Sequence, residues 1–538
     1  MAYEQVWRKD LESLNNVEKI KLDRDGLEVI EAIIKRYSKY GFDSVPEEDR
    51  ILLKWAGIYE QKPRNGLFML RVRINTGKIN VPGAKVLSEI SENYGGSFMR
   101  ITTRGAIQFY NIRLEDLPDI FDKLNNVGLA SYEACGDCPR TVVGNPLVGV
   151  DKNELFDTTE LVNQVNDFLL LNKDFSNLPR KLKISISAST KNAGNSEIND
   201  ISFTPAVKNI KGREVIGFHL KVGGGLSTKP LMAKEVDAFV VPEQVQKVIE
   251  AIATIFRDFG YRNNRNRARL KFLIEDWGIE KFTEKLYEYT GVLPTRGIDK
   301  TESCSHLNYY GVNRQKQEGK SYIGVHVPLG QMNSADFTEL TRISEEYGDG
   351  ILRTTSSQNI IISGVENEKL DEVLSKEIFE KFSYQPKTIL SHIVACTGSK
   401  FCNLALVDTQ NIALKLSRYI DEKLEVDVPI SIKISGCPNS CGHTHTADIG
   451  IRGSVIKEEG KSYEAFDMFL GGKLGQEATF GRKLDLRLRE NELLKAIAKI
   501  IEQYLVHRKN NETFHNFVAR VDLRTFRPRC CVDEVDGE

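Results

Sequence analysis

Four cysteines stand in two close pairs in the second half of the chain. Five residues separate Cys396 from Cys402, and three separate Cys437 from Cys441. Four thiolates that meet in space bind either a [4Fe–4S] cluster or a structural zinc ion. A five-residue gap is long for zinc, and the bacterial ferredoxin run C-x2-C-x2-C is absent. The 34 residues between the pairs contain a helix-like stretch, so we expect two loops that converge.

Basic residues gather in three motifs of the first half. In Arg71-Val-Arg73 and in Lys181-Leu-Lys183 they alternate along a strand, so each pair shares a face, while Arg140 lies on a loop after Cys138-Pro. A single cation is usually a solvated surface charge, but cations inside Val/Ile-rich strands are harder to explain in that way. Fixed cations suit a small oxyanion, because they bind its oxygens and supply protons as those oxygens leave.

Two further basic runs, Arg100–Arg104 and Arg262–Lys271, would suit a cofactor with many carboxylates. The second run also has the charge of a nucleic-acid patch. The net charge of −1 and the lack of interleaved aromatic residues argue against that partner.

Length and composition limit the architecture. The chain has 538 residues, and a single hydrophobic core stops growing near ~250–300, so two or more domains are expected. The composition, 41% hydrophobic and 28% charged, is typical of a soluble globular protein. No apolar run approaches the ~18–20 residues of a membrane span, and no secretory signal is visible. Nine cysteines, four of them in ligand spacing, fit reduced thiols in a cytoplasm.

The chain contains an internal repeat. Residues 90–107 match residues 343–360 at a constant offset of 253, with eight identical pairs. Each copy follows an apolar strand-like run and continues through a helix-like stretch and a Tyr-Gly turn into a second strand, which is a β-α-β unit of ferredoxin-like type. Further on, residues 222–226 match 470–474, and Lys183-Ile-Ser matches Lys433-Ile-Ser. We therefore predict two copies of a small unit, each joined to a larger α/β unit, with the cofactor held between the halves.

Taken together, these motifs resemble the siroheme-dependent nitrite and sulfite reductases, and the ferredoxin-dependent sulfite reductases most closely. The resemblance covers nearly the whole chain, including residues 54–61, 100–108, 136–146, 178–183 and both cysteine motifs. It implies an α+β fold, internally duplicated, with two ferredoxin-like half-domains and two larger α/β domains around a pseudo-two-fold axis. The implied parts are an N-terminal helical segment (1–66), the half-domains (67–125 and 315–372), a siroheme-binding domain (126–300) and a [4Fe–4S]/siroheme domain (385–538).

The resemblance also implies roles for the motifs. Cys396, Cys402, Cys437 and Cys441 would hold the cluster, and Cys441 would also bridge to the siroheme iron. Arg73, Arg140, Lys181 and Lys183 match a catalytic anion pocket. Siroheme carries eight carboxylates, which explains the number of cations. The residues that match siroheme-binding positions are Arg100, Thr102, Thr103, Arg104, Gln108, Arg262, Arg265 and Lys271.

The choice between sulfite and nitrite depends on one position. After Leu-Pro-Arg, nitrite reductases typically have Lys-x-Asn and sulfite reductases have Lys-x-Lys. This chain has Lys181-Leu-Lys183 and so resembles the sulfite reductases at this point. Residues 134–140 also resemble the sulfite branch, whose members can have a thioether matching Tyr59 and Cys135. We therefore favour six-electron reduction of sulfite to sulfide, with reduction of nitrite to ammonia as the alternative. A structural zinc protein and a non-catalytic siroheme-binding protein are the other hypotheses.

The electron donor must be a separate protein. The chain has no G-x-G-x-x-G segment and no flavin or NADPH domain that we can identify. A ferredoxin is the favoured donor and a flavoprotein the alternative, while neither nucleic acid nor a membrane is expected as a partner.

Overall fold

The computed structural model describes residues 5–302 and 308–526. The chain divides into two compact units. The first contains residues 1–225, 231–325 and 331–384, and the second contains 226–230, 326–330 and 385–538. In the part of the chain that the structure describes, no helix is long and apolar enough to cross a membrane.

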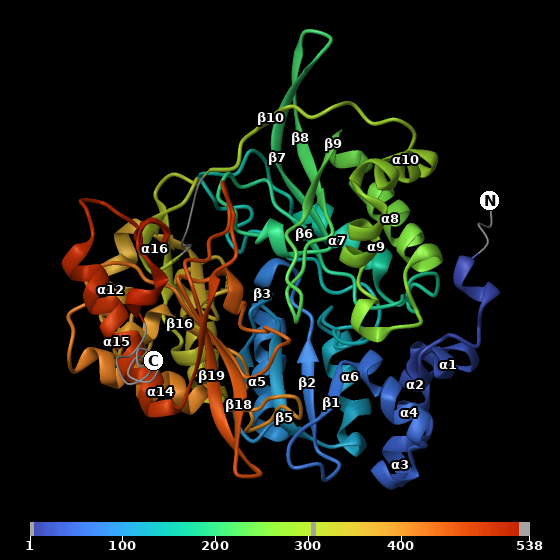
Figure 1. Cartoon of the computed structure of the whole chain (residues 1–538), viewed down its shortest axis with the longest axis horizontal. Coiled ribbons are helices and arrows are strands. Elements are labelled where there is room, and N and C mark those ends of the chain that lie inside the picture. The colour runs from blue at the N-terminus through green and yellow to red at the C-terminus, as the bar shows by residue number, and fades with distance from the viewer. Residues whose placement is uncertain (1–4, 303–307, 527–538) are drawn as a thin grey trace, which may run out of the picture. The chain divides into compact units, whose positions relative to one another are not determined.

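The first unit begins with a run of short helices, coloured blue in Figure 1. They are α1 (Asn16–Asp23), α2 (Gly26–Ala32), α3 (Ser38–Tyr40) and α4 (Glu47–Leu52). Asn15 caps α1, because its side chain accepts hydrogen bonds from the backbone N–H groups of Val17 and Glu18. Asp25 caps α2 in the same way, through Leu27.

Two five-stranded sheets with helices on one face follow. The elements of the first copy are β1 (Ile58–Glu60), β2 (Phe68–Val72), β3 (Lys78–Asn80), α5 (Val81–Asn93), β4 (Phe98–Ile101), β5 (Ile107–Ile112) and α6 (Leu117–Asn125). Those of the second copy are β11 (Gly311–Arg314), β12 (Lys320–Val325), β13 (Gln331–Asn333), α11 (Ser334–Tyr347), β14 (Ile351–Thr354), β15 (Ile360–Glu366), α12 (Leu370–Leu374) and α13 (Ile378–Lys381).

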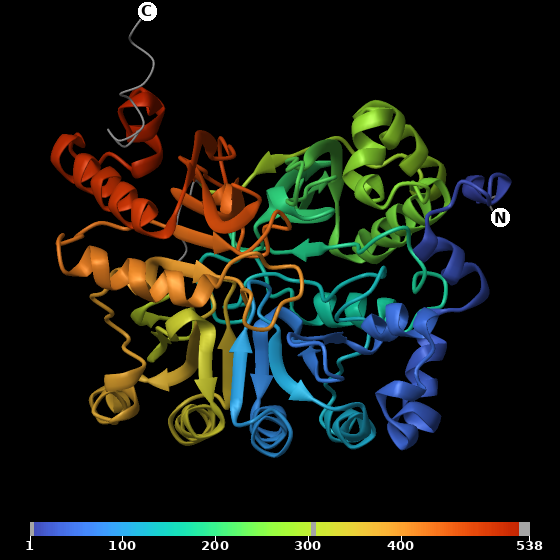
Figure 2. The ribbon, with the colours of Figure 1, turned by 60° about the horizontal axis from the view of Figure 1, so that its bottom comes forward.

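The two copies exchange a strand. The sheet orders are β1-β2-β5-β4-β13 and β11-β12-β15-β14-β3, so β13 of the second copy completes the first sheet and β3 of the first copy completes the second. Asn80 and Asn333 end these exchanged strands and cap the helices α5 and α11 that follow. The two helices pack against each other and are seen end-on at the bottom of Figure 2.

A larger antiparallel sheet with helices belongs to the same unit. Its elements are α7 (Thr159–Leu169), β6 (Ile184–Ile186), β7 (Ile201–Ile210), β8 (Arg213–Val222), β9 (Lys234–Val240), α8 (Val245–Phe259), α9 (Leu270–Trp277), α10 (Ile279–Thr290) and β10 (Ile298–Asp299). The order is β10-β7-β8-β9, and β6 pairs in parallel with β7. The apolar faces of α7, α8 and α9 close one continuous core over β6, β7 and β8.

The second unit repeats this plan. It contains β16 (Ile393–Ala395), α14 (Thr409–Asp421), β17 (Ile432–Ser435), β18 (Ile449–Glu458), β19 (Lys461–Leu470), β20 (Arg482–Leu488), α15 (Glu490–His507) and α16 (Phe514–Arg520). The order is β16-β17-β18-β19-β20, in which β16, β17 and β18 are parallel. Buried residues of α14, α15 and α16 form the core with this sheet.

The register of the two larger sheets corrects one sequence match. Ile184 pairs with Ile201, and Ile432 pairs with Ile449, so the copies correspond at an offset of 248. Lys433 therefore corresponds to Ser185, and the predicted match of Lys183 with Lys433 was wrong by two residues. A shift of two residues leaves each side chain on the same face of a strand, so the hydrophobic pattern does not detect it. The predicted α+β class and the duplication are confirmed.

Candidate functional site

The first unit brings Arg140 beside the two lysines of the Lys-x-Lys motif. The backbone N–H of Arg140 donates to the carbonyl of Leu182 (2.8 Å), and Pro139 forms a parallel bridge with Leu182. Leu182 is buried, whereas Lys181 and Lys183 on either side of it are half-buried. The two lysines thus share the face opposite Leu182, as the alternation predicts. The N–H of Lys183 donates to Asp200 Oδ2 (2.8 Å), which fixes the start of β6.

Arg73 and Arg140 both donate to carbonyls of the loop at residues 133–136. Arg73 donates to the carbonyl of Glu133 (3.4 Å) and to Asn166 Oδ1 (3.1 Å). Arg140 donates to the carbonyls of Ala134 and Gly136, both at 2.8 Å. Both arginines are nearly buried, at 5% and 9% exposure. Such cations are rigid and poorly hydrated, which strengthens their attraction for an anion.

Arg100, on β4, has unsatisfied donors. Its side chain is 2% exposed, and its Nε and Nη1 atoms have no hydrogen-bond partner among the described residues. The Nε atom of Arg140 also has no hydrogen-bond partner among the described residues. Buried guanidinium donors are costly unless an acceptor reaches them, so both arginines fit a ligand that carries carboxylate or other oxyanion groups.

The turn at residues 102–106 holds the next predicted cofactor residues. Thr102 Oγ1 accepts from the N–H groups of Arg104 and Ala106, and Thr103 lies half-buried at the same turn. Arg104 donates to Asn199 Oδ1 (2.7 Å) and to the carbonyl of Thr141 (2.9 Å). Burial, followed by the charge of Arg140, lowers the pKa of Arg104 to about 9. The arginine therefore lies within electrostatic reach of the predicted catalytic cations.

The remaining predicted cofactor residues of this unit have different surroundings. Gln108 on β5 lies against Arg71 and Tyr110. Lys271 is buried on α9 and donates to the carbonyl of Gly225 (3.3 Å). Arg265 is a quarter exposed and binds the carboxylate of Asp137, whereas the guanidinium of Arg262 is buried against Glu18.

The four cysteines lie in the second unit, at the carboxyl ends of adjacent parallel strands. Cys396 follows β16 directly and donates its N–H to the carbonyl of Ile434 (3.0 Å). Cys437 comes two residues after β17 ends, and Gly436 donates its N–H to the sulfur of Cys396 (3.2 Å). Because parallel strands end at the same edge of a sheet, the two cysteine motifs meet there.

Electrostatic interactions link all four thiols. Cys441 influences the pKa values of Cys396 and Cys437, and Cys402 influences that of Cys437. Burial raises the pKa of Cys396 to about 11, so a metal bound there would replace a proton. No three His, Cys, Asp or Glu side chains of the described residues form a group that could hold one metal ion. The four thiolates of a [4Fe–4S] cluster bind different irons and do not require such a group.

A close backbone contact holds the second cysteine loop against β18. A Cβ atom on Gly453 would lie 2.5 Å from the carbonyl oxygen of Gly436, so only glycine allows this approach. His445, four residues after Cys441, contacts Ser440 (3.1 Å) and packs against Phe469.

Three residues of the first unit that contact or face its cations were not identified from the sequence. Asp137 binds both Arg180 and Arg265, and Asn166 holds Arg73. Glu133 is fully buried, and burial raises its pKa to about 7 although Arg73 and Arg140 lower it. Only Asp137 had a signal in the sequence, because it stands between two buried cysteines in the motif Cys135-Gly-Asp-Cys138.

The structure is that of a duplicated α+β protein with a basic cluster in its first unit and four thiols in its second. The family model of the nitrite and sulphite reductase 4Fe-4S domain matches residues 135–293 and 389–535. The model of the nitrite/sulfite reductase ferredoxin-like half domain matches residues 59–127 and 313–376.

Curated and solved relatives agree with the family models. A ferredoxin–nitrite reductase of Synechococcus elongatus is 36% identical over 480 residues, which cover 88% of this chain and 93% of the relative. The sulfite reductase [ferredoxin] 1 of Mycolicibacterium paratuberculosis is 34% identical and aligns over 96% of this chain and 97% of its own length. The solved structure of the Mycobacterium tuberculosis NirA protein superposes with a TM-score of 0.89 at 34% identity, covering 96% of this chain and 98% of that one.

The chain therefore belongs to the nitrite and sulfite reductase family, as its motifs predict. Its cofactors are siroheme and a [4Fe–4S] cluster, and the structural-zinc hypothesis is wrong. The cysteine set of the second unit and the unsatisfied arginines of the first have the chemistry that these groups require. Relatives are named for both anions, so the family does not decide the substrate.

Proposed function

We propose that this protein catalyses the six-electron reduction of sulfite to sulfide and accepts electrons one at a time from a ferredoxin. One observation carries the choice of sulfite: Lys181 and Lys183 flank the buried Leu182 just before β6, and the backbone of Leu182 pairs with that of Arg140. Sulfite carries more charge and one more oxygen than nitrite, so it gains more from a second lysine. The ferredoxin follows from the names of the relatives.

The residues of the first unit bind and protonate the anion. Arg73 and Arg140 present buried guanidinium groups to its oxygens, and the loop at residues 133–136 fixes their orientation. Lys181 and Lys183 donate protons as the oxygens leave. The full reaction consumes six electrons and six protons and releases sulfide and three waters.

The cofactors supply the electron transfer when they are bound. Cys396, Cys402, Cys437 and Cys441 would hold the cluster, and Cys441 would also contribute to siroheme binding. Arg100, Thr102, Thr103, Arg104, Gln108, Arg262, Arg265 and Lys271 would bind or orient siroheme. The unsatisfied donors of Arg100 support this assignment.

The deciding experiment compares kcat/KM for sulfite and for nitrite with one artificial donor and then with reduced ferredoxin, on protein that contains both cofactors. We expect the ratio to favour sulfite. A ratio in favour of nitrite would replace this proposal with nitrite reduction to ammonia. Siroheme absorption without turnover of either anion would instead indicate a non-catalytic siroheme-binding protein.

A further inference from the structure

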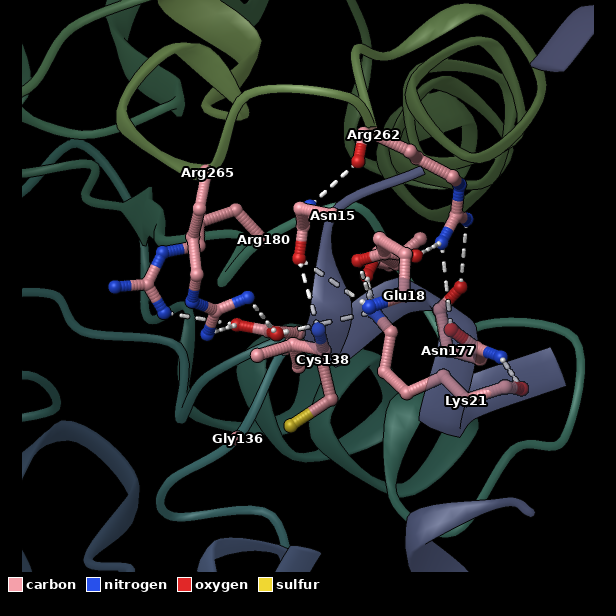
Figure 3. Close-up of polar contacts among 12 residues, drawn as sticks. Asn15, Glu18, Lys21, Gly136, Cys138, Asn177, Arg180, Arg262 and Arg265 are labelled. Atoms are coloured by element: carbon pink, nitrogen blue, oxygen red, sulfur yellow. Dashed lines mark hydrogen bonds and ion pairs between the residues drawn. The ribbon is translucent and has the colours of Figure 1, made fainter. Parts of the chain in front are cut away.

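Asp137 holds two arginines side by side in the first unit. Its carboxylate accepts two hydrogen bonds from Arg265 (2.8 and 3.1 Å) and one from Arg180 (2.9 Å). The carboxylate is buried, at 1% exposure, whereas the arginine side chains are 26% and 30% exposed. One end of each guanidinium is therefore anchored, while the side chain still reaches the surface of the unit. Figure 3 shows the two arginines converging on this carboxylate.

A buried lysine from helix α1 lies behind the same carboxylate. Lys21 Nζ is 3.8 Å from Asp137 Oδ2 and donates to the carbonyl of Leu178 (2.8 Å). Leu178 also donates its N–H to the carbonyl of Asp137 (2.9 Å). Lys21 therefore holds both the aspartate and the segment that carries Arg180, two residues further on.

Glu18, one turn earlier on α1, extends the contact to the segment that carries Arg265. It pairs with Lys21 (2.6 Å) and with Arg262 (2.5 Å). Arg262 donates to the carbonyl of Asn177 (2.8 Å), and Asn15 at the start of α1 donates to the carbonyl of Arg262. Figure 3 shows these contacts as one connected set around α1.

Four charged side chains of this set are buried, and the two arginines at its end are partly exposed. Arg262, Glu18, Lys21 and Asp137 alternate in sign and are all at most 2% exposed. They sum to zero, so the surplus of the set is the two positive charges of Arg180 and Arg265. Burial alone would raise the pKa of Asp137, but Lys21, Arg265 and Arg180 lower it, so the carboxylate stays ionised. A buried set of ion pairs with no net charge, which holds two partly exposed arginines at its end, is suited to present those arginines to an anion.

We propose that Glu18 and Lys21 are positioning residues that act through Asp137 to hold Arg180 and Arg265 for carboxylates of siroheme. The N-terminal helix is then part of the cofactor-binding apparatus. This inference rests on the proposed function, because it takes siroheme as the ligand of the basic set. A carboxylate ligand fits the planar, anchored guanidinium groups, which can each donate two parallel hydrogen bonds.

The test removes the α1 pair without changing the net charge. In the double variant Glu18→Gln/Lys21→Met, siroheme per chain is measured after dialysis against increasing salt, together with kcat and KM for sulfite. We expect siroheme release to be about tenfold faster, the consequence of losing roughly one well-oriented ionic contact. Activity per chain should fall in proportion to the siroheme that is lost. Asp137→Asn should give the same release rate, because it breaks the link while Glu18, Lys21 and Arg262 stay paired.

A matched control exists on helix α10. Lys285 and Glu288 form another i,i+3 pair at 2.6 Å, but this pair is partly exposed. The variant Lys285→Met/Glu288→Gln should release siroheme at the wild-type rate. If the α1 double variant does not fold, Lys21→Met replaces it, since Glu18 then keeps its ion pair with Arg262.

Several results would overturn the inference. Wild-type release from the α1 variant, with or without an effect of Asp137→Asn, would show that α1 does not position the arginines. A change in KM for sulfite at full siroheme retention would assign the pair to the substrate anion instead. Failure of the proposed function is seen separately, in wild-type protein that lacks siroheme or turns over neither anion.

Discussion

The two larger sheets share a framework but carry different chemistry. Asp200 accepts a hydrogen bond from the N–H of Lys183 and, through its carbonyl, one from Gly223, both at 2.8 Å. Asp448 makes the same two contacts with Ser431 and Gly471, also at 2.8 Å. The segment from the first residue of β6 to the short helix η7 (Ser196–Ile198) has the same length as the segment from the first residue of β17 to η13 (Thr444–Thr446).

Equal length allows a residue-by-residue comparison of these connections. The corresponding pairs, first copy before second, are Lys181 with Pro429, Lys183 with Ser431, Ser189 with Cys437 and Ala193 with Cys441. The first copy carries cations where the second is neutral, and the second carries thiols where the first has none. Duplication therefore left cations in one copy and thiols in the other, at corresponding positions of one framework.

The largest effect is expected when a cysteine of the second copy is removed. Cys437→Ala should abolish the cluster, because a [4Fe–4S] cluster needs all four thiolates. Iron and acid-labile sulfide per chain measure the loss. Ser189→Ala, at the corresponding position, removes a hydrogen bond to Asp151 (2.6 Å) and should cost about 1 kcal/mol of stability without loss of iron. Full iron content in Cys437→Ala would contradict the ligand assignment.

The two units should also respond to pH in opposite directions. Burial raises the pKa of Glu133 to about 7 in the first unit, from 4.5, so its protonated form is favoured in the fold. Its contribution to the free energy of unfolding is present below pH 4.5 and falls by up to about 3 kcal/mol as the pH rises through 7. Glu133→Gln should abolish this dependence.

In the second unit, burial and then the charge of His392 lower the pKa of His326 to about 4, from 6.5. The neutral imidazole is favoured in the fold, so stability is present above pH 6.5 and falls by up to about 3 kcal/mol as the pH falls through 4. His326→Gln should remove that loss. Chemical denaturation read by hydrogen exchange would assign each effect to its unit, and equal pH profiles for both units would contradict the comparison.

A smaller effect is expected at Arg100 and Arg353, which occupy corresponding positions on β4 and β14. Arg353 donates to the carbonyls of Pro146 and Val148 and to Ser363, whereas Arg100 has unsatisfied donors among the described residues. Arg100→Met should weaken siroheme binding by about 2 kcal/mol, roughly thirtyfold, with little loss of stability. Arg353→Met should lower stability and leave siroheme affinity unchanged. The reverse pattern would assign the structural role to Arg100.

The smallest effect is expected when a lysine of the first copy is replaced. Lys183→Asn should shift the ratio of kcat/KM values from sulfite toward nitrite by about tenfold, since one charged proton donor is lost. Ser431→Asn, at the corresponding position of the second copy, should leave the ratio unchanged. An unchanged ratio in Lys183→Asn would show that this lysine does not set the choice of anion.

The sequence predicted the features that depend on local spacing. The cysteine motifs, the repeat at offset 253 and the alternation around Leu182 are all encoded within a few residues. The role of Glu18 and Lys21 was not predictable, because an i,i+3 Glu–Lys pair on a helix normally indicates a solvated surface. Only the packing of α1 against residues 177–180 and 262 shows that the pair is buried.

The sequence also gave no sign that β3 and β13 are exchanged. Both are three-residue strands with the same burial pattern, and each is followed by an asparagine-capped helix. Judged by burial pattern alone, either strand could complete either sheet. The partner is set by the packing of α5 against α11, which is a long-range property.

The exchange of β3 and β13 has a consequence for synthesis on the ribosome. In the native sheet the edge of β4 is covered by β13, which emerges about 230 residues later, after roughly 10 to 50 seconds of translation. An uncovered strand edge is a template for pairing with other chains. A premature stop between the repeats would therefore release a polypeptide that lacks the native partner of β4.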